Sequence, residues 1–269
     1  MTMAMTSVTA FLADAAARAR APWDGAALPL RVGVDLGTAT IVLAVVDAAD
    51  QPVYYDQIRA SAVRDGVVVD FAAATAAVRE LRARAQAALG VSLDAAATAY
   101  PPGVGVGESR ACRYVLEAAG LDCRALVDEV SAAQALLRVQ DGAIVDVGGG
   151  STGVGVYRGG SLTELDDLPG GGHHLNLILA GALGIDVDEA EDLKRRHGAE
   201  YLPHLQPGLE RIAHNIDRLM SVRPDGPVHL VGGALMVPGT GEIISRYLDH
   251  PVVEYQHALL VTPFGIALQ

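Results

Sequence analysis

Apolar positions along the chain follow two periods, one typical of strands and one typical of helices. Short apolar runs predict strands at residues 30–34, 41–46, 52–58, 67–70, 98–100, 143–147, 154–157, 228–231 and 252–255. Apolar residues spaced three and four apart predict helices at residues 75–89, 109–119, 175–183, 187–197, 209–220, 242–248 and 261–268. Each half opens with two strands and continues in strand–helix alternation, so the pattern predicts an α/β chain of two similar lobes.

The N-terminal segment carries its own amphipathic pattern. Apolar residues recur at helical spacing between residues 5 and 19, and a loop containing Pro22, Trp23, Asp24 and Pro29 follows. A helix with one apolar face needs a surface that covers this face. The helix therefore either docks on a partner or folds back on its own chain, and the sequence leaves both alternatives open.

Composition excludes several classes of protein. The 269 residues are 51% apolar, which is enough for one large domain or two smaller ones and excludes disorder of the whole chain. The net charge of −12 argues against nucleic acid as a partner, because such binding needs a basic face. Cys112 and Cys123 lack metal-ligand spacing and fit a reduced, cytoplasmic setting. No apolar run reaches the length of a membrane span and no signal peptide is evident, so we expect no membrane association.

Two glycine-bearing turns, each between two predicted strands, carry the candidate chemistry. The first covers residues 35–40 and the second residues 146–152. Glycine lets the backbone approach an anion closely, and a row of main-chain N–H groups can hold phosphate oxygens. An aspartate before the glycines suits Mg²⁺, which binds few carboxylates and keeps several waters. The second turn is neither a Walker loop nor a Rossmann fingerprint, because it lacks the lysine and a strand follows it.

The two turns together are a more specific signal than either turn alone. On two duplicated lobes they would face each other across a cleft, with a nucleoside triphosphate and Mg²⁺ between them. In this arrangement the sequence resembles the actin and heat-shock-chaperone ATPase superfamily from Arg31 onward. Five motifs in the order of that superfamily carry the resemblance: VDLGTAT (34–40), DEVSAA (128–133), VDVGGGSTG (145–153), LVGGALMVPG (230–239) and PFGIAL (263–268).

A narrower resemblance is to the EutJ family of ethanolamine utilisation, carried by ATAYPPG (97–103), VLEAAGL (115–121), GGHHL (171–175) and EAEDLKRRHG (189–198). The implied fold is α/β, with two ribonuclease-H-like lobes facing across a nucleotide cleft and reduced outer subdomains. The implied segments are an N-terminal helix and linker (1–29), lobe I (30–127), a connecting helix (128–141), lobe II (142–251) and a C-terminal return to lobe I (252–269).

The resemblance also implies a role for each motif residue. Asp35 and Asp146 would organise Mg²⁺, and Glu129 would polarise the attacking water, with Asp146 and Thr152 as further catalytic groups. The phosphates would be held by the two turns, at Gly37, Thr38, Ala39, Gly148, Gly149, Gly150 and Ser151. The motif LVGGALMVPG (230–239) resembles the adenosine motif of the superfamily. The nucleoside would lie between Glu191 and Lys194 and against this motif, at Gly232, Gly233 and Ala234.

Two departures from the superfamily pattern bear on turnover. Val130 stands where the superfamily has a proline that fixes the start of the connecting helix, so we expect Glu129 to be held more loosely. No position matches the catalytic lysine of the heat-shock chaperones. The resemblance therefore implies binding of ATP and ADP, and at most slow hydrolysis.

The narrower resemblance implies an ATP-switched, chaperone-like accessory protein. Its partner would be an enzyme of ethanolamine catabolism, with ethanolamine ammonia-lyase as the candidate, and the N-terminal segment could direct the chain to a bacterial microcompartment. The alternatives are a filament-forming bacterial actin-like protein, a small-molecule kinase on the same fold, and an activator whose cysteines hold an iron–sulfur cluster. The oligomeric state stays open.

Two further stretches have ambiguous patterns. His173 and His174 follow three glycines, and they either line the cleft near the ribose or form a packed or surface pair. The acidic stretch at residues 164–167 predicts a solvated turn.

Overall fold

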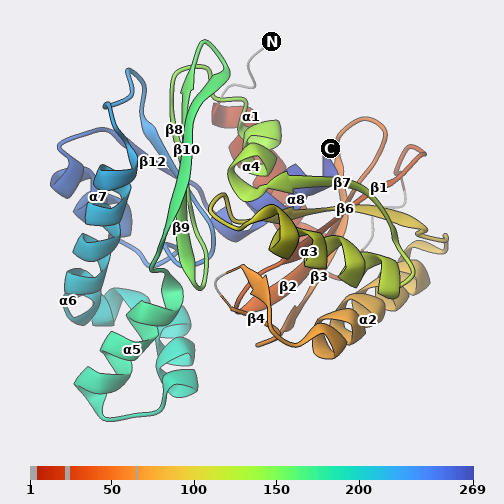
Figure 1. The fold of residues 1–269 in the computed structure, drawn as a ribbon, viewed down its shortest axis with the longest axis horizontal. Helices are drawn as coiled ribbons and strands as arrows, with labels where there is room; N and C mark the ends of the chain where they lie inside the picture. Colours follow the sequence, from red (N-terminus) through yellow and green to blue (C-terminus); the bar gives the residue numbers. More distant parts are fainter. Residues whose placement is uncertain (1–4, 22–24, 65) are drawn as a thin grey trace. The chain divides into compact units, whose positions relative to one another are not determined.

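The computed structural model describes residues 5–21, 25–64 and 66–269 and divides the chain into two units (Figure 1). Unit 1 contains the described residues up to Arg138 together with Leu260–Gln269, and unit 2 contains Val139–Leu259. Pro22, Trp23 and Asp24 of the predicted linker lie outside the described residues. Among the described residues, none of the helices combines the length and the apolar character that crossing a bilayer requires.

Each unit is built on a five-stranded sheet with the same topology. In unit 1 the strand order is β3-β2-β1-β6-β7, and in unit 2 it is β10-β9-β8-β11-β12. In both sheets the first two pairings are antiparallel and the last two are parallel. The strands are β1 (Arg31–Leu36), β2 (Thr40–Val46), β3 (Pro52–Arg59), β6 (Ala95–Tyr100), β7 (Asp122–Asp128), β8 (Gly142–Val147), β9 (Ser151–Arg158), β10 (Ser161–Pro169), β11 (Val228–Val231) and β12 (Val252–Glu254). The internal duplication predicted from the sequence is confirmed.

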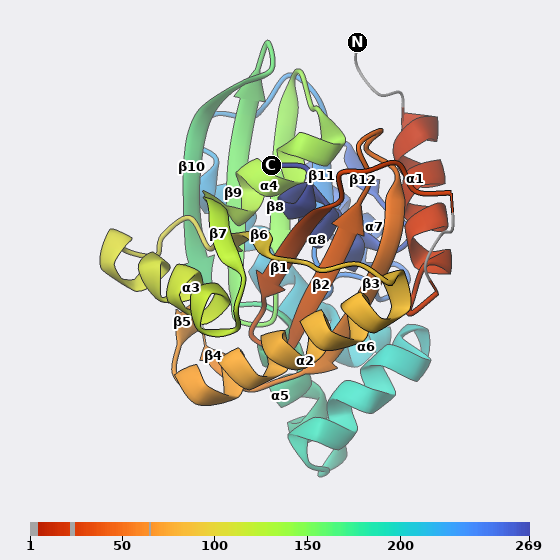
Figure 2. The ribbon, with the colours of Figure 1, turned by 90° about the vertical axis from the view of Figure 1, so that its right-hand side faces the viewer.

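Helices cover the sheet of unit 1 on both faces (Figure 2). Val32 and Val34 of β1 share an apolar core with Val78 of α2 (Phe71–Leu89). Gly33, between them, faces the other side, where an added Cβ would lie 2.4 Å from the backbone nitrogen of Ala267 in α8 (Val261–Ala267). Because both faces are covered, β2 buries all seven of its residues and shows no alternation of apolar and polar positions.

The remaining elements of unit 1 complete this layered arrangement. α3 (Val106–Ala118) packs on β6 and β7, and α4 (Glu129–Leu137) packs on α8. At the contact of α4 with α8, an added Cβ on Gly265 would lie 2.0 Å from the carbonyl oxygen of Ala132, so only glycine fits there. β4 (Val63–Arg64) and β5 (Val67–Val68) form a small antiparallel hairpin.

The N-terminal helix α1 (Met5–Ala17) folds back on unit 1 and lies alongside β3 (Figure 2). Its apolar side chains Val8, Phe11, Leu12 and Ala15 are buried. The ring of Phe11 meets the ring of Phe264 in α8 edge to face, with centroids 5.4 Å apart. Of the two alternatives that the sequence left open, packing on the chain's own body is the one observed.

In unit 2, α6 (Val187–Leu219) and α7 (Thr240–Leu248) pack on the sheet, and α5 (Gly172–Leu183) packs on α6. The sequence predicted two helices, at 187–197 and 209–220, but the structure has one helical run with a kink at His197 (φ −132°, ψ 25°). Pro203 and Pro207 lie between the two predicted helices and disfavour a continuous helix, yet α5 and α7 pack against the run and support it.

Four sequence expectations are corrected by the sheets and caps. α2 begins at Phe71 rather than residue 75, because the carboxylate of Asp70 accepts a hydrogen bond from Ala73 N at 2.9 Å and caps the first turn. Residues 164–167 belong to β10 and not to a turn, and β7 was missed. Both are edge strands with little apolar alternation. Residues 252–254 form β12 beside β11, so the return to unit 1 begins at Leu260 and not at residue 252.

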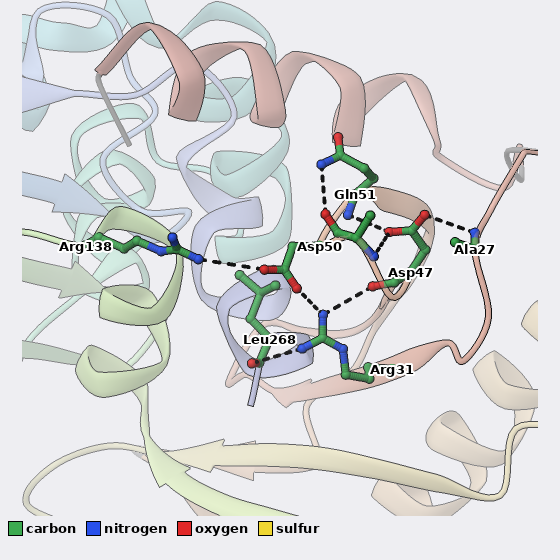
Figure 3. Close-up of polar contacts among 8 residues, drawn as sticks. Ala27, Arg31, Asp47, Asp50, Gln51, Arg138 and Leu268 are labelled. Carbon is green, nitrogen blue, oxygen red and sulfur yellow. Dashed lines mark hydrogen bonds and ion pairs between the residues drawn. The ribbon is translucent and has the colours of Figure 1, made fainter. Parts of the chain in front are cut away.

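A charged cluster around Asp50 ties three parts of unit 1 together (Figure 3). Arg31 of β1 pairs with Asp50 and donates hydrogen bonds to the carbonyl oxygens of Asp47 at 3.2 Å and Leu268 at 3.4 Å. Arg138, the C-cap residue of α4, lies 3.7 Å from the other carboxylate oxygen of Asp50. The turn between β2 and β3 is thereby linked to the C-terminal ends of α4 and α8.

Asp47 holds that turn through main-chain hydrogen bonds. Its buried carboxylate accepts from Ala49 N at 2.8 Å, Gln51 N at 2.9 Å and Ala27 N at 3.1 Å (Figure 3). Burial raises the pKa of Asp47, but these hydrogen bonds and the charge of Arg31 outweigh it and leave the pKa below its ordinary value.

We expect Asp47→Asn to lower the free energy of unfolding by about 1–3 kcal/mol, because one acceptor oxygen becomes a donor that faces another donor. A carboxylate with a lowered pKa stabilises the folded state above its unfolded-state pKa, near 4, and this contribution is lost as the pH falls through the folded-state value. The difference between wild type and variant should therefore shrink below about pH 4. Urea unfolding at several pH values measures it, with Asp14→Asn on the exposed side of α1 as the control. A difference that does not change with pH would contradict this account.

Candidate functional site

The second glycine turn (residues 148–151) joins β8 to β9 in unit 2. Asp146 lies one residue before the end of β8 and is 6% exposed. Val147 pairs with Thr152 across the hairpin, and Gly148 N donates to Ser151 O at 3.1 Å, which closes the turn. The three glycines thus sit at the tip of a rigid hairpin, next to a buried carboxylate.

A second glycine segment, the glycine strap (residues 170–173), holds this turn from the side. Gly170 N donates to Gly150 O at 2.8 Å, Gly172 N to Gly148 O at 2.9 Å, and His173 N to Gly149 O at 2.8 Å. An added Cβ on Gly171 would lie 2.4 Å from Gly148 O, so a larger residue would separate the two segments. The strap was missed as part of the site, although its row of three glycines was a visible signal.

Thr152 is a positioning residue in this structure. Its side chain is fully buried and its hydroxyl donates to the carbonyl oxygen of Gly170 at 2.6 Å. A buried hydroxyl whose proton is engaged in this way helps to fix the strap. The catalytic role expected for Thr152 stays a prediction.

The adenosine motif follows β11 and packs against the end of β8, next to the second glycine turn. Gly232 has φ +89°, and an added Cβ would lie 2.4 Å from Val147 O and 2.5 Å from a carboxylate oxygen of Asp146. Ala234 N donates to Val147 O at 3.2 Å. Gly233 is exposed, whereas Ala234 is buried. The motif therefore rests directly on the end of β8, beside Asp146.

Glu191 and Lys194 of α6 form a largely buried ion pair at 2.8 Å. Burial lowers the pKa of Lys194, and the neighbouring Glu191 charge opposes this effect. For Glu191 burial acts to raise the pKa, but the charges and hydrogen bonds of Lys194 and Arg195 bring it down to about 2. Lys194 Nζ also donates to Gly172 O at 3.3 Å, which connects the ion pair to the glycine strap.

The unit 2 residues predicted from the sequence thus come together. An added Cβ on Gly172 would lie 3.3 Å from Ala234 Cβ and 3.5 Å from Lys194 Nζ, so three separate segments meet at this glycine. Turn, strap, ion pair and adenosine motif therefore lie against one another within unit 2. Separations of about 20 to 90 residues along the chain hid this proximity from the sequence.

Unit 1 holds the other predicted residues. Asp35 lies in β1 and precedes the first glycine turn, where an added Cβ on Gly37 would lie 2.6 Å from Thr40 O. Glu129 is the first residue of α4, and Asp128 before it caps the helix by accepting from Ser131 N at 2.7 Å. This cap fixes the start of α4 without a proline, which corrects the expected loosening of Glu129.

Cys112 lies buried near these acidic groups. Its own burial, and then the charges of Glu129 and Asp35, raise the pKa of the thiol to about 12. Cys123 is buried as well. Buried thiols of raised pKa are poor ligands for a shared iron–sulfur cluster, because the thiolate is the ligand. Both observations count against the activator alternative.

Comparison with known proteins identifies the family of this chain. The ethanolamine utilization protein EutJ of Escherichia coli is 38% identical over 240 residues, which span 89% of this chain and 85% of that protein. The crystal structure of EutJ from Carboxydothermus hydrogenoformans superposes with a TM-score of 0.86 at 42% identity, covering 91% of both chains. The chain belongs to the EutJ family.

More distant similarities of this EutJ-family chain concern the fold. Residues 143–261 match the family of the cell division protein FtsA. The crystal structure of an MreB of Spiroplasma citri bound to AMPPNP superposes with a TM-score of 0.73 at 17% identity, covering 88% of this chain and 94% of that one. The α/β fold with two lobes of actin-like ATPase type is therefore confirmed. The cleft between the lobes and the metal role of Asp35 and Asp146 stay predictions.

We expect Gly232→Ala to lower the free energy of unfolding of this EutJ-family chain by more than about 1 kcal/mol, because the φ of +89° and the contact with Asp146 both exclude a side chain. Chemical denaturation measures it. Gly181→Ala on α5 is the matched control, since its Cβ would meet nothing within 4 Å, and a helix interior gains up to about 1 kcal/mol from this change. Equal effects of the two substitutions would contradict the close approach at Gly232.

Proposed function

We propose that this chain binds ATP and ADP together with Mg²⁺ and acts as a nucleotide-regulated accessory protein of ethanolamine utilisation. One observation supports the proposal above all: the glycine turn, the buried Asp146, the Glu191–Lys194 pair and the adenosine motif meet within unit 2. The EutJ-family membership and the actin-like ATPase fold agree with it. The structures of MreB with ADP and with AMPPNP show nucleotides bound to this fold in other proteins.

The residues of unit 2 suit a nucleotide in their chemistry. Gly148, Gly149 and Gly150 place main chain without side chains at the tip of the hairpin. Gly148 N–H closes the turn on Ser151 O, and the N–H groups of Gly149 and Gly150 would hold phosphate oxygens. The α5 helix begins at Gly172, so its N-terminal dipole adds positive potential beside the turn. Ser151 and, from unit 1, Gly37, Thr38 and Ala39 would complete the phosphate contacts.

Asp146 and Asp35 would hold Mg²⁺ through its water ligands. Bound Mg²⁺ would neutralise charge on the phosphates and on a leaving diphosphate. Among the described residues, no group of three or more His, Cys, Asp or Glu side chains forms a closed metal site. Two carboxylates with waters and phosphate oxygens are the ligand set that Mg²⁺ commonly uses.

Glu191 and Lys194 would bracket the ribose and the adenine, with the base against Gly232, Gly233 and Ala234. The low pKa of Glu191, about 2, keeps its carboxylate ionised at neutral pH, so it can accept hydrogen bonds from ribose hydroxyls. Gly233 is exposed and carries no side chain, so its main chain can contact a flat ring. The ion pair thus serves binding rather than turnover.

Glu129 would orient the attacking water, and hydrolysis would be slow. Phosphoryl transfer depends on positioning and charge stabilisation, and the Asp128 cap sets the position of Glu129 at the start of α4. With ATP bound the two lobes would close, and the closed form would bind an enzyme partner differently from the open form. We propose ethanolamine ammonia-lyase as this partner.

We propose the cytoplasm, and the bacterial microcompartment within it, as the place of action. The apolar face of α1 is covered by unit 1, with Phe11 packed on Phe264. An α1-dependent route into a microcompartment therefore requires release of this helix, and replacing Phe11 would promote it.

Titration calorimetry with ATP, in Mg²⁺ and in EDTA, tests nucleotide binding. We expect wild type to bind ATP more tightly in Mg²⁺, and Asp146→Asn to weaken this binding at least tenfold. The loss follows from removal of the negative oxygen that orders the hydrated ion. In EDTA the variant should bind ATP as tightly as wild type or more tightly, because the carboxylate that repels bare phosphate is gone.

Asp166→Asn is the control, because Asp166 is an exposed aspartate of β10 in the same unit. No heat of binding for wild type would contradict nucleotide binding altogether. Equal affinity of wild type and Asp146→Asn in Mg²⁺ would contradict the metal role of Asp146.

A further inference from the structure

A cavity of about 130 Å³ opens between α5 and α6, which lie side by side in unit 2 (Figure 1). Its size is close to that of an engineered cavity of about 150 Å³ that binds benzene. None of the residues assigned to the nucleotide lines it, so it is separate from the site proposed above.

The walls of this cavity are mostly apolar. Leu177 and Ile178 of α5 face Ile212 of α6 across it. Leu177 is 46% exposed, which places it at the opening of the cavity. Gly208 lets the two helices approach, since an added Cβ would lie 2.7 Å from Ile178 Cδ1. The space therefore suits a compact apolar group of about six carbons.

Polar residues also line this cavity. His174 Nδ1 has no hydrogen-bond partner among the described residues, but other atoms cover it, so His174 forms part of the wall without offering this nitrogen to an occupant. Arg211 lines the cavity and is exposed, so it lies at the opening. Its side chain forms no ion pair with the other described residues. Asn215 donates to Pro169 O at 3.2 Å and lines the inner end. Arg211 therefore supplies a cationic hydrogen-bond donor at the opening of a mostly apolar cavity.

We propose that this cavity binds a small monocarboxylate with a compact apolar body of about six carbons. The apolar body fills the space between Leu177, Ile178 and Ile212, and the carboxylate accepts hydrogen bonds from the guanidinium of Arg211. One guanidinium balances one negative charge. Apolar walls beside it disfavour ligands with several charges, such as phosphates, because burial of an unpaired charge is costly.

The inner wall of the cavity is part of the glycine strap. Gly170 lines the cavity, its N–H donates to Gly150 O, and its carbonyl accepts from Thr152. An occupant therefore contacts the segment that holds the second glycine turn. By linkage, nucleotide affinity and carboxylate affinity should then change each other by the same factor.

Benzoate is the probe for this site, and benzamide is its neutral counterpart of equal size. Binding is measured on the nucleotide-free, full-length chain by ligand-observed saturation transfer and by amide chemical shifts. We expect benzoate to bind and to shift amides of α5 and α6 around His174, Leu177 and Arg211, and benzamide to bind at least tenfold more weakly.

Two exposed arginines of α6 provide a matched pair of variants. Arg211→Gln should weaken benzoate binding at least tenfold, whereas Arg218→Gln, on the same helix but outside the cavity, should leave it unchanged. Ile178→Phe should abolish binding by filling the space, with circular dichroism as the check on folding. If Ile178→Phe fails to fold, the arginine pair still decides the question.

Three results would overturn the proposal: no binding of benzoate at millimolar concentration, equal binding of benzamide, or equal effects of the two arginine variants. Because nucleotide is absent from these measurements, their outcome does not depend on whether the chain binds ATP. An ATP titration with and without saturating benzoate then tests the linkage through Gly170.

Discussion

Close contact between main-chain segments at glycine positions is the constraint on which the candidate site depends. Gly171 and Gly232 approach the end of the β8–β9 hairpin from two sides, and at either one a Cβ would come within about 2.4 Å of a carbonyl oxygen. The hydrogen bonds that fix the turn come from the main chain of the strap and of the adenosine motif. The turn is therefore held in one shape by the protein itself, which would lower the entropic cost of the polyphosphate binding proposed for it.

The same constraint shapes unit 1, where it serves packing. Gly33 and Gly265 allow α8 to lie against β1 and α4 at distances that no side chain would permit. The glycine of the PFGIAL motif is thus explained by the contact of two helices. The ion pairs of Asp50 with Arg31 and Arg138 hold the ends of these helices to the β2–β3 turn (Figure 3). These pairs are half exposed, so the close apolar contact, rather than charge, supplies most of the stability there.

The sequence predicted the parts of the fold that follow from local pattern. Central strands such as β2 and β8 are continuous apolar runs because both faces are buried, and the glycine turns between strands are equally local signals. Edge strands β7 and β10 escaped prediction, since their pairing to one neighbour places no fixed apolar period on the sequence. In the site, Asp146, Lys194 and Gly232 were found through motifs. The strap and the engaged hydroxyl of Thr152 depend on contacts between distant segments, which spacing does not reveal.

A chain with a net charge of −12 needs a local reason to bind a polyanion. At physiological ionic strength, charges more than about 8 Å away are largely screened, so the nearest groups decide. Around the second glycine turn these are main-chain N–H groups, the N-terminus of α5 and the ammonium of Lys194. Against them stands Asp146, whose buried carboxylate repels phosphate unless a cation lies between them. With the metal role proposed for Asp146, the same carboxylate would oppose bare ATP and favour its magnesium complex, and this difference would make the site selective between the two forms.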